Sequence, residues 1–187
     1  MKVIIKCEES QVVCMEFRKR GHEAYSCDLL PTSGLHPEWH IQCDVRELLR
    51  EYFDLVIFHP PCTRLANSGV RWLHERDLWK EMEEAAEFFN LRHEFNSPKV
   101  ATENPIPHKY AVDLIGKYDQ IIQPWMFGHG ETKATCLWLK GLPLLKPTNI
   151  VEGREGRIWK MSPGPDRSRL RSRSYQGIGK AMAEQWG

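Results

Sequence analysis

Short runs of apolar residues recur along this chain and are separated by polar, glycine-rich and proline-rich segments. An apolar run of about 4–8 residues with turn-forming residues at its borders predicts a buried strand. On this pattern we expect strands at residues 3–7, 24–28, 41–44, 54–58, 99–102, 121–123 and 135–139.

Between these runs, apolar residues recur at helical spacing. Val12, Val13 and Phe17 share one face of a helix that Ser10 can cap and that Gly21 ends. We also expect helices at residues 77–95, 110–117 and 178–186, and a brief one after the capping-box pair Asp44 and Glu47. Alternating strands and helices predict a single α/β domain over residues 1–187, a doubly wound, mostly parallel sheet with helices on both faces.

The composition narrows the class of protein. Hydrophobic residues make up 41% and charged residues 27% of the 187 residues, which is typical of a globular domain. The net charge of +1 argues against a protein that binds nucleic acid over most of its surface. No apolar run approaches the roughly 18 residues of a membrane span, and the first apolar run is too short for a signal peptide. The six cysteines form no Cys-x-x-Cys pair, so we expect free thiols, no metal and a cytoplasmic location.

Two of the expected strands end in polar residues that suggest chemistry. Cys62 follows one strand through Pro60 and Pro61, which fix the backbone path of the thiol. Glu103 and Asn104 follow the next strand. Because the carboxyl ends of parallel strands meet at one edge, we expect one site there. A thiol with a carboxyl partner indicates covalent catalysis; the alternatives are a structural thiol and a surface carboxylate.

These residues resemble the motifs of the cytosine-C5 DNA methyltransferases, above all their short phage and prophage members. Pro60-Pro61-Cys62 is similar to the nucleophile motif, and Glu103-Asn104-Pro105 to the Glu-Asn-Val motif. Residues 175–182 resemble the closing motif of the family. The resemblance follows the motif order of the family over nearly the whole chain.

The resemblance implies a Rossmann-like, class I S-adenosylmethionine-dependent fold and transfer of a methyl group to C5 of cytosine in DNA. Cys62 would add to C6 of the ring, and Glu103 would contact N3. Lys133 and Thr135 stand where the family has arginines and complete the expected catalytic set. A free thiol needs activation, and Arg64 or His59 could provide it.

A set of residues is expected to hold S-adenosylmethionine. Asp28 ends a strand at the place where an acid commonly binds the ribose hydroxyls. Asp44 matches an acid near the adenine in the family, although it could instead cap a helix. Acids in the first turn fit a cationic sulfonium better than a phosphate. The other expected cofactor contacts are Cys7, Glu8, Ser10, Leu29, Pro60 and Gly177.

The chain departs from the family in ways that affect its substrate. The first turn has no glycine, and residues 141–174 form only a short basic loop region where the family has a target-recognition domain. Within that region Arg167, Arg169, Arg171 and Arg173 alternate, which places them on one side of an extended segment. With Arg64 they are candidates for phosphate contacts, and the alternative is a solvated loop.

Three functions therefore remain open. The first is methylation of cytosine in DNA, either single-stranded or a duplex with the target base flipped out. The second is the same chemistry on a free nucleotide such as dCMP, and the third is a catalytically silent DNA-binding homologue. We expect a bacterial or prophage-bearing cell, no membrane partner, and either a monomer or a dimer.

Overall fold

A seven-stranded sheet in the order β3-β2-β1-β4-β5-β7-β6 forms the centre of the molecule. The computed structural model describes residues 1–164 and 167–187, and it describes only the backbone of Trp159, Ser168 and Arg169. The strands are β1 (Lys2–Lys6), β2 (Glu23–Asp28), β3 (His40–Gln42), β4 (Leu55–Phe58), β5 (Val100–Pro105), β6 (Gln120–Ile122) and β7 (Thr135–Lys140). All pair in parallel except β7, which is antiparallel to β5 and β6.

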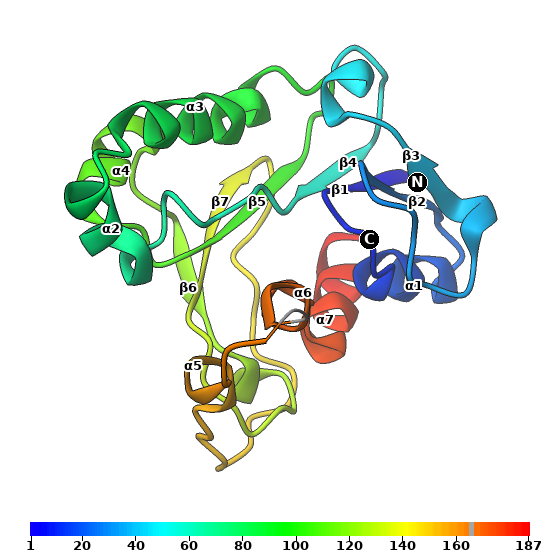
Figure 1. Cartoon of the computed structure of the whole chain (residues 1–187). Helices are drawn as coiled ribbons and strands as arrows, with labels where there is room; N and C mark the ends of the chain where they lie inside the picture. The colour runs from blue at the N-terminus through cyan, green and yellow to red at the C-terminus, as the bar shows by residue number, and fades with distance from the viewer. Residues whose placement is uncertain (165–166) are drawn as a thin grey trace.

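Helices cover both faces of this sheet, as Figure 1 shows. The α-helices are α1 (Val12–Lys19), α2 (Val70–Glu75), α3 (Trp79–Asn90), α4 (Lys109–Ile115), α5 (Arg157–Lys160), α6 (Arg167–Ser172) and α7 (Gln176–Trp186). Short 3-10 turns are η1 (Pro37–Trp39), η2 (Val45–Leu48), η3 (Asn67–Gly69), η4 (Leu91–His93) and η5 (Pro124–Met126). The predicted α/β class with a doubly wound, mostly parallel sheet is confirmed.

The central strands are apolar on both faces because both faces are covered. Val3 and Ile5 of β1 pack in one core with α1 and α7. Ile4, on the opposite face of β1, belongs to a second core with Val56 and Phe58 of β4. A third core lies under α3 and α4.

The first helix begins differently from the prediction. Ser10 is not its cap; the N-cap position is held by Gln11, whose φ of 58° is left-handed. The free N–H groups of Val13 and Cys14 donate instead to the carboxylate of Glu8, at 2.7 and 3.2 Å. A buried acid five residues upstream of Val13 thus performs the capping that was assigned to Ser10.

The helix expected at residues 77–95 is present as α3, and the 3-10 turn η4 follows it directly. Asp77, with a positive φ of 50°, lies just before α3 and separates it from α2, a helix that the sequence pattern did not predict. Met82 and Phe89 are buried as expected. The capping box of Asp44 and Glu47 is confirmed at the start of η2.

The basic region at 141–174 is not extended around its arginines. Arg167 and Arg171 lie one helical turn apart on α6, and Arg173 follows the helix. The prediction that these side chains alternate along an extended segment is therefore wrong, because the local backbone is helical. The side chain of Arg169 lies outside the described residues.

Two loops that leave the carboxyl ends of β4 and β5 are joined to each other. Asn67 N–H donates to the Ile106 carbonyl at 2.8 Å, and His108 N–H donates to the Leu65 carbonyl at 3.1 Å. His108 is 2% exposed. Its Nδ1 accepts from Ala111 N–H at 3.0 Å, and its Nε2 lies 2.9 Å from the Arg64 carbonyl. Since Nδ1 accepts, Nε2 carries the proton and donates it to that carbonyl.

No helix in the described part of the chain is both long enough and apolar enough to cross a membrane.

We predict that His108→Ala lowers the free energy of unfolding by about 2–4 kcal/mol, because it removes a helix cap and leaves the Arg64 carbonyl unpaired. Chemical denaturation of the wild type and the variant measures this change. The matched control is His108→Asn, which can cap α4 but is too short to reach Arg64. The free energy of unfolding of His108→Asn should lie between those of the wild type and His108→Ala. A loss under about 0.5 kcal/mol for His108→Ala would show that the hydrogen bonds of His108 do not stabilise the two loops.

Candidate functional site

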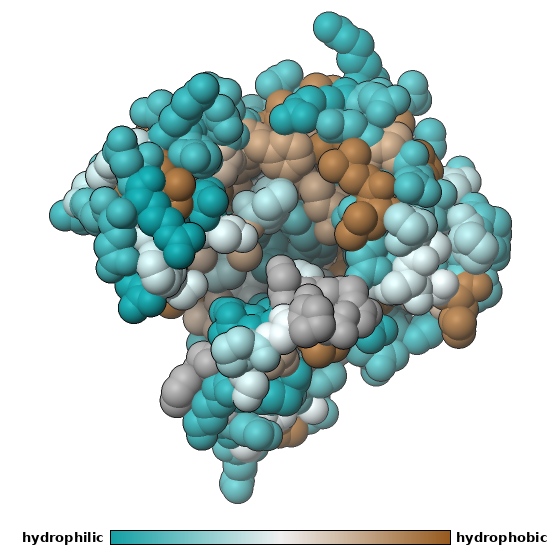
Figure 2. All heavy atoms as spheres, viewed as in Figure 1, coloured by the Kyte–Doolittle hydropathy of each residue, from teal (hydrophilic) through white to brown (hydrophobic). Residues whose placement is uncertain are grey.

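The carboxyl edge of β1 and β4 is the topological switch point of the sheet. The chain leaves β1 toward β2 on one side, whereas β4 pairs with β5 on the other, so the loops after β1 and β4 diverge there. Figure 2 shows a hollow near the centre of the face that contains this edge, between the α2–α4 side and the α1 side of the molecule. Most of the predicted catalytic and cofactor residues lie on loops at this edge.

Cys62 lies on the loop after β4. Pro60 is buried and Pro61 is exposed, which anchors one end of the loop and leaves the thiol half-buried. The Cys62 carbonyl accepts from the N–H groups of Leu65 and Ala66, so the chain turns sharply after the thiol. The thiol is thus partly accessible on a loop with a defined path.

Glu103 forms an ion pair with His59. Parallel pairing aligns Phe58 of β4 with Thr102 of β5, so the next residue of each strand meets its counterpart. His59 Nδ1 lies 2.8 Å from Glu103 Oε2, and both side chains are mostly buried.

The two partners shift each other's pKa in opposite directions. Burial alone would raise the pKa of Glu103, but the hydrogen bond and charge of His59 outweigh it, and Lys133 adds to them, so this pKa is lowered. Burial alone would lower the pKa of His59, but Glu103 and Glu8 raise it. Both shifts favour a charged pair, imidazolium and carboxylate.

The charges around the thiol come from several elements. Burial raises the pKa of Cys62, and the charge of Glu103 raises it further, whereas Lys133 and Arg171 lower it. Of the two activators suggested by sequence proximity, His59 binds Glu103, and neither His59 nor Arg64 is among the cations that lower the pKa of Cys62. The cations that favour the thiolate thus come from distant segments.

Lys133 and Thr135 lie where the chain enters β7. Lys133 N–H donates to Gln123 Oε1 at 3.0 Å, and its ammonium lies 5.8 Å from the centre of the Tyr175 ring. Thr135 is buried, and its hydroxyl donates to the Lys133 carbonyl at 3.3 Å. The charge of Lys133 acts on Cys62 and Glu103, while the hydroxyl of Thr135 bonds the backbone beside Lys133.

The first turn replaces glycines with two residues in the left-handed region. Cys7 and Gln11 have φ values of 59° and 58°. Glu8 is 4% exposed, and burial raises its pKa. Its carboxylate accepts from the N–H groups of Val13 and Cys14, so a phosphate group would have to displace Glu8 to bind these two donors. Ser10 is half-buried within the turn.

The loop after β2 folds over the first turn. Ser33 N–H and the Thr32 hydroxyl donate to the Glu9 carbonyl at 3.0 and 2.7 Å. Gln11 exchanges two hydrogen bonds with the backbone of His36. These hydrogen bonds hold the loop after β2 against the first turn, beside the place where a cofactor is expected to bind.

The acids expected to hold a cofactor lie near Cys7. Burial raises the pKa of Cys7 to about 12, and the charges of Asp28 and Asp44 add to the shift. Asp28 Oδ1 accepts from Leu30 N–H at 3.0 Å, and no hydrogen bond among the described residues uses its Oδ2. Both oxygens of Asp44 bind Arg46, so the capping alternative holds for Asp44. Leu29 is 68% exposed beside them.

Gly177 packs against the segment between η5 and β7. Its N–H donates to His129 Nε2 at 2.9 Å, and an added Cβ would lie 1.9 Å from the Phe127 carbonyl oxygen. This close approach explains the need for glycine at the start of α7.

The arginines considered for nucleic acid are spread over the surface near the site. Arg171 acts electrostatically on Cys62, and Arg167 donates to the Met161 carbonyl at 2.9 Å. Arg173 is exposed, and Arg64 is half-buried on the loop after Cys62. No cluster of His, Cys, Asp and Glu in the described ranges could hold a metal.

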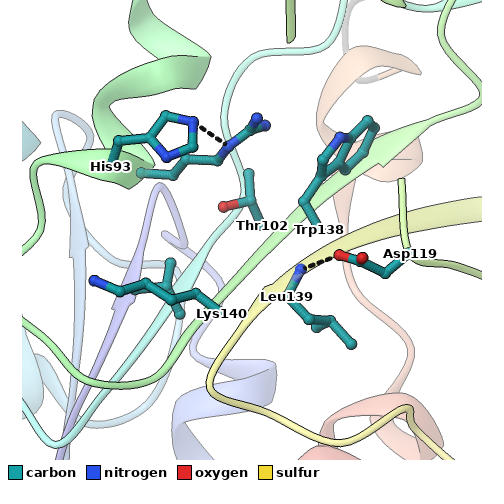
Figure 3. A pocket seen from close by; sticks show the side chains of 8 residues that line it. His93, Thr102, Asp119, Trp138, Leu139 and Lys140 are labelled. Atoms are coloured by element: carbon teal, nitrogen blue, oxygen red, sulfur yellow. Dashed lines mark hydrogen bonds between the residues drawn. The ribbon is translucent and has the colours of Figure 1, made fainter. Parts of the chain in front are cut away.

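A separate cavity of about 130 Å³ lies on the α3 side of β5 and β7, as Figure 3 shows. It is lined by Arg92, His93, Val100, Thr102, Asp119, Trp138, Leu139 and Lys140. Arg92 Nη1 and Thr102 Oγ1 are buried without a partner among the described residues. Ordered water satisfies such groups in a cavity of this size, so we assign it no chemistry.

Sequence reasoning missed two functional contacts. His59 precedes the two prolines and was considered only as a neighbour of Cys62, although the alignment of β4 with β5 pairs it with Glu103. His108 occupies the N-cap position of α4. Its place just before a predicted helix is the one feature of the sequence that could have pointed to this role.

Comparison with known proteins identifies the fold. The chain is similar to a crystal structure from Escherichia coli described as a DNA modification methyltransferase encoded within a prophage, with a TM-score of 0.51 and 15% identity over 81% of this chain and 52% of that one. The chain is less similar to Entamoeba histolytica methyltransferase EhMeth and to an Escherichia coli rRNA methylase, with TM-scores of 0.46 and 0.40. These two similarities are too weak to support a conclusion about this chain. The chain spans only 52–57% of the lengths of these three structures. No protein-family model and no curated protein matches it. At 15% identity the likeness shows the fold alone, and that fold is the Rossmann-like fold of the methyltransferases.

Proposed function

We propose that this protein transfers a methyl group from S-adenosylmethionine to C5 of cytosine in DNA through a covalent bond between Cys62 and C6. The observation that carries the proposal is that Cys62, on the loop after β4, and the buried ion pair of His59 with Glu103 lie at the same switch point of the sheet. A half-buried thiol among charges is typical of a nucleophile and not of a structural cysteine.

The residues of the site divide the chemistry between them. The thiolate of Cys62 adds to C6, which makes C5 electron-rich enough to take a methyl group. Lys133 and Arg171 favour that thiolate, because positive charge lowers its pKa. Glu103 lies close enough to Cys62 to act on its charge, as a residue contacting the same base must. The partly buried loop limits water around the reacting ring.

The residues at the edge of β1 and β2 fit S-adenosylmethionine. Asp28 has one carboxylate oxygen free of described hydrogen bonds, as a residue that binds ribose hydroxyls requires. Glu8 occupies the N-terminus of α1, which disfavours a phosphate-bearing cofactor and favours a cationic one. S-adenosylmethionine supplies the methyl group when it is bound. Asp44 is already paired with Arg46, so we assign it to capping.

Arginines beside the nucleophile loop favour DNA over a free nucleotide. Arg71 lies on α2 and Arg76 follows it, and both stack on Trp72, with guanidinium carbons 4.1 and 4.3 Å from the ring centre. Neither arginine forms an ion pair with an acid in the described part of the chain. The stacking limits the motion of both guanidinium groups and leaves their N–H donors available to the phosphates of a DNA backbone.

The central prediction is a trapped covalent adduct. A pool of duplexes that carry 5-fluorocytosine in varied contexts should form a stable bond with the protein when S-adenosylmethionine is present, measured by mass spectrometry. Cys62→Ala should abolish the adduct, and Glu103→Gln should slow it by about 10²–10⁴-fold. An adduct that persists in Cys62→Ala, or labelling of free 5-fluoro-dCMP in preference to DNA, would contradict the proposal.

The charges around Cys62 predict how its reactivity depends on pH. Alkylation of Cys62 should have its midpoint above the ordinary pKa of about 8.5, because burial and Glu103 disfavour the thiolate. Glu103→Gln should move the midpoint to lower pH and Lys133→Met to higher pH. Rates of iodoacetamide modification from about pH 6 to about pH 11, a range that brackets the ordinary thiol pKa, measure this midpoint. Glu87→Gln on the exposed side of α3 is the matched control, and shifts of the opposite sign would refute this assignment.

Salt dependence tests the contact with DNA. Each phosphate contact contributes about 0.9 to the slope of log affinity against log salt. We expect Arg71→Gln combined with Arg76→Gln to reduce that slope by about 2, as measured by fluorescence anisotropy with a labelled duplex. Lys80→Gln on α3, where Lys80 already pairs with Glu84, is the control and should change the slope little. An unchanged slope in the double variant would show that α2 does not contact the DNA.

A further inference from the structure

We propose that Cys27 and Cys43 are an oxidation site, where a peroxide forms a reversible disulfide that weakens binding of the cofactor at the carboxyl edge of β1, β2 and β3. The site is separate from the nucleophile loop of Cys62. Its effect on the cofactor rests on the proposed function, which assigns S-adenosylmethionine to this edge, whereas formation of the disulfide does not depend on that function.

The register of the sheet brings the two thiols together. Cys27 of β2 pairs with Ile41 of β3, and Cys43 comes two residues after Ile41, where a side chain returns to the same face. Both cysteines accordingly pack in the same core. Their Sγ atoms lie 3.7 Å apart, and the Cys27 thiol lies 3.8 Å from the Cys43 carbonyl.

A disulfide requires a small approach of the two sulfur atoms. An S–S bond is about 2.05 Å long, so the sulfurs must come about 1.7 Å closer than the 3.7 Å at which they lie (3.7 − 2.05). Cys27 is on a strand that is bonded on both sides, whereas Cys43 follows a three-residue strand at the edge of the sheet. The segment that carries Cys43 is therefore the one that yields.

The two thiols differ in exposure, which sets the order of the reaction. Cys43 is half-buried, so a molecule as small as hydrogen peroxide can reach it, whereas Cys27 is fully buried. Peroxide oxidises the Cys43 thiol to a sulfenic acid and leaves as one water. The Cys27 sulfur then attacks the Cys43 sulfur, and the displaced hydroxide takes the proton of the Cys27 thiol to form a second water. Two thiols thus give two electrons to one peroxide.

A buried lysine lies beside the pair. Lys6 of β1 is the register partner of Cys27, and its side chain is fully buried. Its ammonium donates to the Leu48 carbonyl at 3.1 Å and lies 4.1 Å from the centre of the Phe95 ring. Burial raises the pKa of Cys27 and Cys43 raises it further, while the charge of Lys6 lowers it. Lys6 therefore favours the thiolate form, which is the one that attacks sulfur.

The two cysteines immediately precede the acids at the expected cofactor edge. Asp28 follows Cys27, and Asp44 follows Cys43. The proposed function assigns Asp28 to the ribose, through the carboxylate oxygen that no described hydrogen bond uses. The Asp28 carbonyl accepts from the Cys43 N–H at 3.1 Å, so a shift of Cys43 acts directly on Asp28. The disulfide therefore disturbs the residue that is expected to hold the cofactor.

Peptide mapping tests the disulfide without reference to activity. The full chain with Cys62→Ala, which removes the nucleophile thiol as a competing target, is treated with hydrogen peroxide and digested without reduction. A peptide that links Cys27 to Cys43 should appear, and dithiothreitol should remove it. Cys136→Ala in the same background is the matched control and should give the same linked peptide, because Cys136 is buried in a different core. Absence of the linked peptide, or a link from either cysteine to another thiol instead, would overturn the inference.

Calorimetry measures the effect on the cofactor. Oxidation of the Cys62→Ala protein should lower its affinity for S-adenosylmethionine by at least about fivefold, the lower end of the usual coupling between two sites, and reduction should restore the affinity. Cys43→Ser in the same background cannot form the disulfide, so its affinity should not respond to peroxide. An equal response in that variant would assign the effect to another thiol and contradict the proposal.

The coupling must also act in the opposite direction. In a glutathione redox buffer, each protein disulfide that forms converts one oxidised glutathione into two reduced molecules. Bound S-adenosylmethionine should lower the equilibrium constant for this exchange by the same factor by which the disulfide lowers the affinity. Linked peptides quantified with and without the cofactor measure that factor.

The outcomes separate this inference from the proposed function. If the disulfide forms and the affinity does not change, the coupling to the cofactor is overturned. If the reduced protein binds no S-adenosylmethionine, the proposed function fails and the effect on the cofactor fails with it. The linked peptide still decides in that case whether Cys27 and Cys43 are an oxidation site.

Discussion

The parallel pairing of β4 with β5 is the constraint on which the candidate site depends. Phe58 at the end of β4 pairs with Thr102 of β5, so the next residues, His59 and Glu103, are brought together at the carboxyl edge of the sheet. His59 meets Glu103 as a direct result, and the two loops then run side by side to His108. A change of one residue in this register would turn both side chains to opposite faces of the sheet.

Buried charge is the second organising feature. Glu8 and His59 lie on the loops after β1 and β4, Glu103 lies on β5, and Lys133 precedes β7; these four groups act on one another electrostatically. An isolated buried charge destabilises a protein strongly, but paired charges offset much of that penalty. The arrangement thus ties four segments of the chain to one site and makes the ionisation of each group depend on its neighbours. Such mutual dependence is common where perturbed pKa values serve chemistry.

The first turn shows how side-chain hydrogen bonds can hold a strained backbone in place. Cys7 and Gln11 adopt left-handed backbone conformations that disfavour side chains by about 1 kcal/mol each. Glu8 offsets this strain by bonding the first amides of α1, and the loop after β2 bonds Glu9 and Gln11. The turn keeps its path through side-chain hydrogen bonds in place of backbone freedom. A helix N-terminus occupied by a carboxylate also differs in its ligand preference from one left open for phosphate.

The sequence alone determined the strands, most of the helices and the edge where Cys62 and Glu103 lie. Apolar runs and helical spacing are local signals, and the carboxyl ends of parallel strands meet wherever such a sheet forms. Only the tertiary structure decided the partners of these residues. It shows that His59 forms the ion pair with Glu103, that Lys133 and Arg171 act on Cys62, and that Glu8 caps α1. It also decided that the segment from Arg167 to Ser172 is helical and that a separate helix, α2, precedes Asp77. These features depend on contacts between residues far apart in the chain, and local patterns carry no information about such contacts.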